Sequence, residues 1–354
     1  MTQDISLDWL TMAAVKPNEW ARQEAMTRQV QLTKPPGALG QLEEVAIQLA
    51  ALQGTQYPQI DRVHITVFVG DHGIAAEGVS AFPQTVTTQM VNNFASGGAA
   101  INVAAKAINA KLEVINLGTV NEANSSNVVK SYRLGAGTAN FCIEPAMTQE
   151  QLANALSAGR DAVEQACACN ADLFIGGEMG IGNTSSATAL TCALLNELPG
   201  KVVGPGTGLD GYGVNRKANL IEKALSTHRA FLNIPLEMLR RLGGFEIAAL
   251  TGAYIACAQK GLPVLVDGFI AGSAALMAFR LCSGVENWLF YSHMSAEPGH
   301  RLIVDALNAT PLLNLGMRLG EGSGAAVAVP MLRMACAFHN DMATFSQAQV
   351  SEKR

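Results

Sequence analysis

Two glutamates stand inside glycine-rich turns, a setting that leaves a carboxylate uncovered beside a ligand. Glu178 lies in "GGEMGIGNT" (176–184), and Glu321 lies between Gly320 and Gly322 ahead of an apolar helical pattern. Flanking glycines let a ligand approach the backbone, and an apolar setting raises the pKa of a carboxyl group. Glu321 is therefore a candidate general base, and the same reasoning applies to Glu178. Two acids at one crevice could divide the work, one taking a proton and the other facing a developing positive charge. The alternative for each is a glutamate stabilised by the dipole of a helix N-terminus.

The turn around Glu178 almost matches the phosphate-binding motif G-x-x-x-x-G-K-[ST], but Asn183 stands where the lysine belongs. A strand end followed by a helix start still offers backbone N–H groups to an anion. Because the lysine that reaches the outer phosphates of a triphosphate is missing, the loop favours a ligand with a single phosphate. The alternative is a tight turn in which Asn183 or Thr184 is an ordinary helix N-cap.

A second glycine-rich loop, "GPGTGLDGYGVNRK" (204–217), could form another wall of the same phosphate site. Its spacing is G-x-G-x-G, which differs from the dinucleotide fingerprint G-x-G-x-x-G. Gly206 would approach the phosphate, and Lys217 would supply a countercharge. The alternative is that Lys217 is a solvated residue on a helix surface.

Asp71 and His72 follow the apolar run "VHITVFVG" and could suggest a metal site. No further histidine stands at ligand spacing, so we expect no metal and expect both residues to hold their loop in place. Phe82, Gln89 and Met90 come next and could line a pocket for an aromatic ligand. Such residues are more often plain core, which is the alternative here.

These residues must be positioned by short apolar runs. Each run is followed by glycine or an acid and then by a helical pattern. The runs cover residues 63–73, 112–118, 171–180, 262–269 and 287–295. They lack polar alternation, which is typical of parallel strands covered on both faces. Helical patterns such as 151–168 and 215–231 lie between them. The order predicts an α/β fold with a doubly wound, Rossmann-like parallel sheet, whose ligand binds beyond the carboxyl ends of the strands.

Both ends of the chain differ from this pattern and read as mostly helical. We expect a large α/β nucleotide-binding domain over residues 60–295. A smaller, mostly helical domain would be built from residues 1–59 and 296–354. We expect it to cover the mouth of the sheet and to complete the active site.

Composition narrows the class of partner. The chain has 354 residues, 49% of them hydrophobic and 15% charged, with a formal net charge of -5 and no Lys/Arg cluster. This indicates a globular protein that binds small molecules rather than nucleic acid. We see no signal peptide and no membrane span. The seven cysteines form no C-x-x-C pair, which favours reduced thiols in a cytoplasmic protein.

Taken in order along the chain, these loops resemble the nicotinate-nucleotide–dimethylbenzimidazole phosphoribosyltransferase family. The resemblance covers nearly the whole chain. It rests on "KPPGALGQLE", "DHGIAAEGVSAFPQ", "GGEMGIGNTSSA", "VVGPGTG", "GGFEIAALTGA", "GLPVLVDGFIAGSAAL", "SHMSAEPGH" and "MRLGEGSGAA". Several collinear motifs of this length are far more specific than one glycine loop.

The resemblance implies a reaction and a set of site residues. The family displaces nicotinate from nicotinate mononucleotide with 5,6-dimethylbenzimidazole, giving α-ribazole 5′-phosphate for cobalamin, with no metal or organic cofactor and with a homodimer as the expected assembly. It implies that Glu321 is the general base and that Glu178 lies near the ribose. The phosphate and nucleotide residues would be Gly180, Asn183, Thr184, Gly206, Lys217, Ser295 and Gly320. The benzimidazole pocket would contain Phe82, Gln89, Met90, Met179 and Leu319.

Two alternatives stay open on the sequence alone. One is a nucleotide phosphotransferase that uses the 176–184 turn, although Asn183 and the lack of a metal-binding carboxylate pair count against it. The other is a protein that binds a nucleotide or a benzimidazole without turnover. The range of bases accepted by the pocket is also open.

Overall fold

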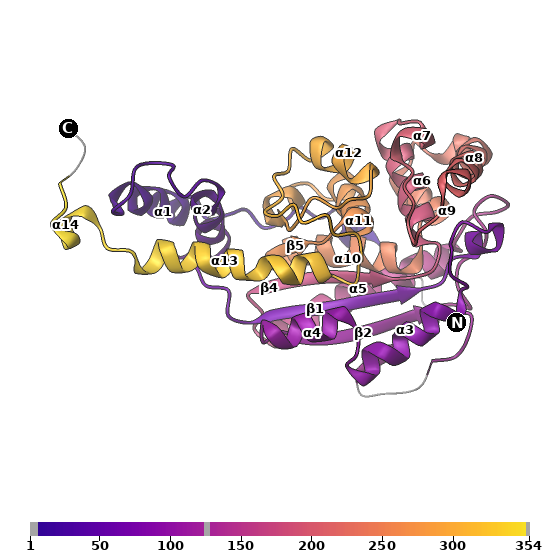
Figure 1. The fold of residues 1–354 in the computed structure, drawn as a ribbon, viewed down its shortest axis with the longest axis horizontal. Helices are drawn as coiled ribbons and strands as arrows, with labels where there is room; N and C mark the ends of the chain where they lie inside the picture. The colour runs from indigo at the N-terminus through magenta and orange to yellow at the C-terminus, as the bar shows by residue number, and fades with distance from the viewer. Residues whose placement is uncertain (1–5, 124–127, 352–354) are drawn as a thin grey trace.

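A parallel sheet of six strands forms the centre of the computed structural model, which describes residues 6–123 and 128–351 (Figure 1). The strand order is β3-β2-β1-β4-β5-β6. The strands are β1 (Val63–Gly70), β2 (Lys111–Gly118), β3 (Val129–Ser131), β4 (Leu173–Met179), β5 (Val264–Val266) and β6 (Leu289–Tyr291). This is the order of a doubly wound sheet, and it reverses between β1 and β4, where such folds bind ligands. The predicted fold class is therefore confirmed.

Helices connect the strands. They are α1 (Glu19–Gln31), α2 (Gln41–Gln53), α3 (Thr85–Ser96), α4 (Ala100–Ala107), α5 (Gln149–Ala168), α6 (Asn183–Leu195), α7 (Pro199–Val202), α8 (Gly211–His228), α9 (Pro235–Leu242), α10 (Phe245–Lys260), α11 (Phe269–Leu281), α12 (Gly299–Ala306), α13 (Ser323–Asp341) and α14 (Phe345–Ala348). Short 3-10 turns, η1 (Asp8–Thr11), η2 (Gly73–Glu77), η3 (Arg229–Phe231) and η4 (Val285–Trp288), complete the described elements.

Both faces of the sheet are covered, as the apolar strands require. A Cβ at Gly176 of β4 would meet Leu250 and Tyr254 of α10, whereas a Cβ at the next residue, Gly177, would meet the backbone of Glu321. Because successive residues of a strand point to opposite faces, α10 covers one face and the turn before α13 lies on the other. All eight residues of β1 are buried accordingly.

The chain differs from the predicted strands at the edges of the sheet. β5 and β6 are only three residues long, and residues 292–295 after β6 are irregular. β3 was not expected from the sequence. It is a three-residue edge strand with no buried residue, too short and too exposed to give an apolar pattern.

The N-terminal helices α1 and α2 lie away from the mouth of the sheet. α1 and α2 lie beside the far end of α13, at the opposite end of the molecule from α6 to α9 (Figure 1). Near that end of α13, Arg333 Nε donates to the carbonyl oxygen of Ile60, and Asn340 Nδ2 donates to that of Pro58, just before β1 begins. The 19-residue α13 spans about 28 Å, so it carries the C-terminal segment from the carboxyl edge of the sheet to the amino edge.

The domain boundaries remain a prediction. α12 falls within residues 296–354, which we expected to belong to the smaller domain. It packs against α11, α6 and α7 of the expected large domain.

Candidate functional site

A hollow of about 300 Å³ lies at the carboxyl ends of β4, β5 and β6. It contains most of the residues that the sequence predicts for the site. The predicted residues that line it are Phe82, Glu178, Met179, Gly180, Asn183, Thr184, Gly206, Ser295, Leu319 and Gly320. The tails of three strands and two glycine loops therefore meet at one crevice, as the parallel sheet requires.

Four predicted residues do not line this hollow in the described structure. Gln89 is exposed and Met90 is partly buried, both on α3. Lys217 is fully buried behind the glycine loops, where its Nζ donates to Thr184 Oγ1 at 2.8 Å. Glu321 is 5% exposed and directly follows Gly320, which does line the hollow.

The loop between β4 and α6 is built by close backbone contacts. A Cβ at Gly180 would lie 2.0 Å from the carbonyl oxygen of Gly70, so only glycine fits there. Gly182 has φ 101° and is the N-cap of α6 without a side-chain hydrogen bond. Asn183 and Thr184 are therefore not the N-cap, and their side chains are free for other roles. Asn183 Nδ2 donates to Glu178 Oε2.

The 204–208 loop is held from two sides. Glu297 Oε1 accepts from the Gly206 N–H at 3.1 Å, and Arg318 Nη1 donates to the Gly206 carbonyl oxygen at 2.8 Å. Thr207 Oγ1 accepts from the Ala81 N–H at 3.0 Å, which brings the segment carrying Phe82 over the same hollow. The Gly206 N–H is thus engaged by a carboxylate, and a phosphate would have to replace or share that contact.

Lys217 and Glu297 form an electrostatic pair beneath this loop. Burial lowers the pKa of Lys217 to about 8, although Glu297 opposes the shift. Burial raises the pKa of Glu297, and Lys217 opposes that shift in turn. The ammonium is mostly charged at neutral pH, so the crevice retains a buried cation that could face a phosphate.

Glu321 is held in a left-handed turn. Gly320, Glu321 and Gly322 have φ of 88°, 63° and 81°, and φ of this sign is uncommon for a residue with a side chain. The Glu321 N–H donates to the carbonyl oxygen of Glu178 at 3.2 Å, which ties the turn to β4. Such a conformation persists only where its surroundings enforce it.

The Glu321 carboxylate points to the start of α4, where Oε2 accepts from the Ile101 N–H at 3.3 Å. Burial raises its pKa, the Ile101 amide opposes this, and the nearby Asp267 raises it further. The carboxylate therefore does sit at a helix N-terminus, but at that of α4 and not of the following α13. A raised pKa makes this group a stronger proton acceptor once ionised.

Glu178 lies in a concentration of carboxylates. Burial raises its pKa well above the ordinary value, and Glu246, Asp267 and Glu321 add to the shift. A Cβ at Gly320 would lie 2.3 Å from Glu178 Oε1, so the two glycine turns are in direct contact. The two glutamates that the sequence singled out are therefore neighbours.

Sequence reasoning missed several residues of the hollow. Asp267, His293, Glu297 and Arg318 line it together with the predicted residues. All four lie inside stretches that carry the family resemblance, "VDGF", "SHMSAEPGH" and "MRLG". Nearby, His300 Nδ1 accepts from the Ser295 N–H at 2.9 Å, and burial lowers the pKa of this imidazole to about 3, so it stays neutral.

Asp71 and His72 are buried, and their side chains contact residues that are distant in the sequence. Asp71 accepts from Thr87 Oγ1 at 2.6 Å and from the Val120 N–H at 2.9 Å. His72 Nε2 lies 2.6 Å from an oxygen of Glu246. In the described part of the chain, no three His, Cys, Asp or Glu side chains gather in a way that could hold a metal ion.

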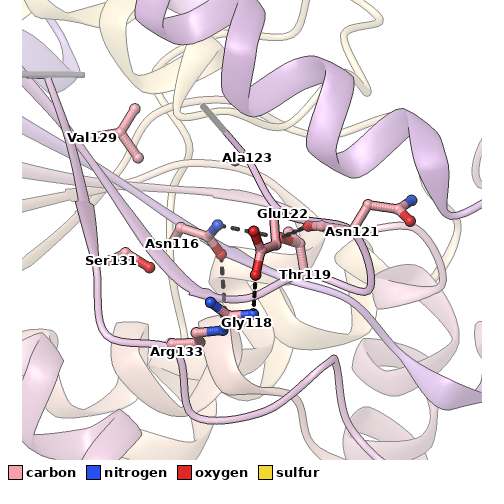
Figure 2. A pocket seen from close by; sticks show the side chains of 9 residues that line it. All are labelled: Asn116, Gly118, Thr119, Asn121, Glu122, Ala123, Val129, Ser131 and Arg133. Carbon is pink, nitrogen blue, oxygen red and sulfur yellow. Dashed lines mark hydrogen bonds and ion pairs between the residues drawn. The ribbon is translucent and has the colours of Figure 1, made fainter. Parts of the chain in front are cut away.

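A larger hollow, of about 460 Å³, lies across the tips of β2 and β3 (Figure 2). Its polar groups bind one another: Arg133 pairs with Glu122 at 2.5 Å, and Asn116 Nδ2 donates to Thr119 Oγ1 at 3.2 Å. None of the site residues predicted from the sequence lines it. We therefore place the candidate site in the smaller hollow.

Comparison with known proteins is consistent across three approaches. A family model described as "Phosphoribosyltransferase" matches residues 14–350. Proteins named nicotinate-nucleotide–dimethylbenzimidazole phosphoribosyltransferase from Xanthomonas oryzae and Pseudomonas aeruginosa are 57% and 55% identical. The alignments cover 98% and 99% of this chain, and 100% and 99% of those proteins.

The chain also resembles solved structures. A crystal structure of the enzyme of that name from Thermus thermophilus superposes with a TM-score of 0.90 at 44% identity. The match covers 95% of this chain and 100% of that one. Among the helices in residues 6–123 and 128–351, none combines the length and apolar character that a membrane span requires.

Proposed function

Because the chain belongs to the phosphoribosyltransferase family, we propose that it transfers phosphoribosyl from nicotinate mononucleotide to 5,6-dimethylbenzimidazole. The products would be nicotinate and α-ribazole 5′-phosphate, a building block of cobalamin. The observation that carries this proposal is one crevice lined by two glycine loops and Glu178, with Glu321 directly after the lining residue Gly320 and Lys217 buried against Thr184. The names of the close relatives support the choice of both substrates.

The nucleotide phosphate would lie between the 180–184 and 204–208 loops. Lys217 would supply the positive charge from below, and Arg318 stands at the rim, where it already holds Gly206. Ser295 and Gly320 line the same hollow and would contact the rest of the nucleotide. A single phosphate can be bound by these few groups. This agrees with the absence of a lysine from the 176–184 turn.

Glu321 would act as the general base. It would take the N–H proton of the benzimidazole while the other ring nitrogen attacks C1 of the ribose. The bond from C1 to the pyridinium nitrogen then breaks, and its electron pair neutralises that nitrogen. Because the leaving group departs as a neutral pyridine ring nitrogen, it needs no acid, and one base with electrostatic stabilisation is sufficient.

Glu178 would face the positive charge that develops at the ribose. In the free protein its raised pKa favours the neutral acid. A bound pyridinium nucleotide brings a positive charge beside it, which favours the carboxylate form and lowers its pKa. Binding of the nucleotide would therefore charge the residue that stabilises the transition state.

The benzimidazole pocket would lie over the segment that carries Phe82. Phe82, Met179 and Leu319 line the hollow and offer apolar surface to a flat ring. Gln89 and Met90 would contact the ring only if α3 moved toward the hollow, or if the ring extended beyond the hollow toward α3. The pocket could accept other bases of similar shape.

The experiment that tests this proposal mixes the protein with both substrates and follows free nicotinate and α-ribazole 5′-phosphate by chromatography. We expect both products to form in equal amounts, and no nicotinate release when the benzimidazole is omitted. Binding of both substrates without turnover at any pH would instead indicate a binding protein. Nicotinate release without the nucleotide product would indicate hydrolysis.

We also propose that the protein is a cytoplasmic homodimer. The described cysteines are free thiols, which fits a reducing compartment. Exposed Trp20 and Val30 on α1 offer apolar surface for a second chain. Light scattering coupled to gel filtration should give twice the mass of 37.2 kDa, and a single-chain mass would contradict the dimer.

A further inference from the structure

Asp267 follows β5 and lines the crevice, yet its carboxylate is turned toward the backbone of another segment. Oδ2 accepts from the Gly322 N–H at 3.2 Å, and Oδ1 accepts from the Ala325 N–H at 2.9 Å. The side chain is 3% exposed. Both amides belong to the segment that begins α13, immediately after Glu321.

These two contacts supply what α13 lacks locally. The first N–H groups of a helix have no partner inside the helix and are usually satisfied by an N-cap side chain. Here the N-cap is Gly322, which has no side chain to do so. Asp267, 55 residues away in the chain, takes that role and at the same time fixes the turn of residues 320–322.

The turn is held on its other side by β4. A Cβ at Gly177 would lie 2.3 Å from the Glu321 carbonyl oxygen, and the Glu321 N–H donates to Glu178. The strained backbone of Glu321 is therefore clamped between β4 and Asp267. Loss of either contact would allow the turn to relax toward commoner backbone angles.

A histidine lies beside Asp267, at a distance longer than a hydrogen bond. His293 Nε2 lies 3.7 Å from Asp267 Oδ1, and both side chains are 3% exposed. Gly324 makes room for this arrangement, because a Cβ there would lie 2.1 Å from His293 Cδ2 and 2.9 Å from Asp267 Oδ1. The glycine in "GSG" is thus needed for packing as well as for the helix start.

We propose that Asp267 is a positioning residue that holds the Glu321 turn in its strained conformation through two backbone N–H groups. This inference rests on the proposed role of Glu321. The proposal also assigns a function to two stretches that have none in the catalytic assignment, "VDGF" and "GSGAA". Asp267 needs no contact with the reacting atoms in this role.

A double-mutant cycle tests this positioning role, with kcat measured from nicotinate release for the wild type, Glu321→Gln, Asp267→Asn and the double variant. Asp267→Asn should lower kcat about 10- to 100-fold in the wild type, because small misplacement of a catalytic group has effects of this size. The same change should lower kcat less than about 3-fold in Glu321→Gln, where no base is left to position. The KM for nicotinate mononucleotide should change less than about 3-fold, since the phosphate loops are untouched.

Asp172→Asn is the matched control. Asp172 precedes β4 at the opposite edge of the sheet and also accepts from two backbone N–H groups, those of Asp61 and Arg62. We expect it to leave kcat unchanged. If Asp267→Asn does not fold, as judged by thermal unfolding and nucleotide binding, Asp267→Glu takes its place in the cycle. The longer side chain displaces the carboxylate from the two N–H groups, with an expected loss of about 10-fold in the wild type only.

Equal losses in both backgrounds, or an unchanged kcat in Asp267→Asn, would overturn the positioning role. A change confined to KM would assign Asp267 to substrate binding and would overturn it as well. Near-normal turnover by Glu321→Gln alone would contradict the general base, a result that is separate from the behaviour of Asp267. The two proposals therefore fail in distinguishable ways.

Discussion

Buried carboxylates occupy two regions of this sheet, and their surroundings are opposite. Between β1, β2 and β3, Glu113 has a partner at each oxygen: His64 Nε2 lies 3.2 Å from one, and Lys130 Nζ lies 2.7 Å from the other. Burial opposes ionisation, but these two partners prevail and lower the pKa of Glu113 to about 2. This group is paired and charged at neutral pH.

At the carboxyl ends of the strands, Glu178 and Glu321 have no ion pair with a Lys or Arg among the described residues. Two other acids there do have basic neighbours, since Glu246 contacts His72 and Glu297 lies near Lys217. Glu178 and Glu321 have raised pKa values, because burial dominates and neighbouring acids add to it. One oxygen of Glu246 and one of Glu297 have no hydrogen-bond partner among the described residues. Keeping such groups costs stability, and proteins accept that cost mainly where chemistry needs it.

In this fold the structural carboxylate has basic partners that compensate its charge, whereas the two carboxylates proposed to take part in the reaction do not. A chain selected for stability alone would pair the edge carboxylates as it pairs Glu113. A bound pyridinium nucleotide would supply the missing positive charge. The carboxylates of Glu178 and Glu321 therefore obtain a compensating positive charge only when the substrate is bound.

The largest expected effect comes from exchanging one acid in each region for glutamine. Glu321→Gln should lower kcat about 10²- to 10⁴-fold while leaving nucleotide affinity close to normal, because it removes a base and no phosphate contact. Glu113→Gln should leave kcat unchanged at temperatures where the variant is folded. Steady-state kinetics and calorimetric titration with nicotinate mononucleotide measure both, and near-normal turnover by Glu321→Gln would remove it from the base role.

A smaller effect is expected from the buried cation. Lys217→Met should raise the KM for nicotinate mononucleotide about 10- to 100-fold, since a charge-assisted phosphate contact is lost. Lys223→Met, on the exposed side of the same helix, is the control and should leave KM unchanged. Because burial places the Lys217 pKa at about 8, KM of the wild type should also rise as pH increases through that value. An equal KM for both variants would place the phosphate elsewhere.

The smallest expected effect is on stability. Glu113→Gln should lower the free energy of unfolding by about 1 to 3 kcal/mol at pH 7, because Lys130 and His64 lose a charged partner. Since the pKa of Glu113 is lowered on folding, its contribution is present above the unfolded value of about 4.3 and declines as pH falls toward about 2. Urea unfolding should therefore show a gap between variant and wild type that narrows below pH 4. A gap that widens there would contradict the pairing.

The features that could be predicted from the sequence are those encoded by residues close to one another in the chain. Apolar runs predicted the strands, and glycine turns predicted the loops that meet at the crevice, including Glu178 and Asn183. Ser295 came from the family resemblance. The family resemblance is confirmed over almost the whole chain. These features depend on neighbouring residues in the chain, which a single sequence displays.

Features that depend on distant partners could not be predicted in this way. Asp267 acts on Gly322, and Glu297 acts on Gly206, across separations of 55 and 91 residues. The burial of Lys217, which the sequence left open, follows from the packing of α8 beneath the glycine loops. The position of α1 and α2 also depends on the length and direction of α13, against which α2 packs.

Titration of the glutamate side chains tests the central contrast most directly. Carbon-13 NMR of protein labelled at glutamate carboxyl carbons, with Glu113→Gln, Glu178→Gln and Glu321→Gln each removing one resonance for assignment, gives the individual pKa values. We predict that Glu113 remains ionised at pH 4, while Glu178 and Glu321 bind protons above the ordinary value of about 4.3. The account would be contradicted if Glu178 and Glu321 titrated at or below that value, or if Glu113 were protonated at pH 4.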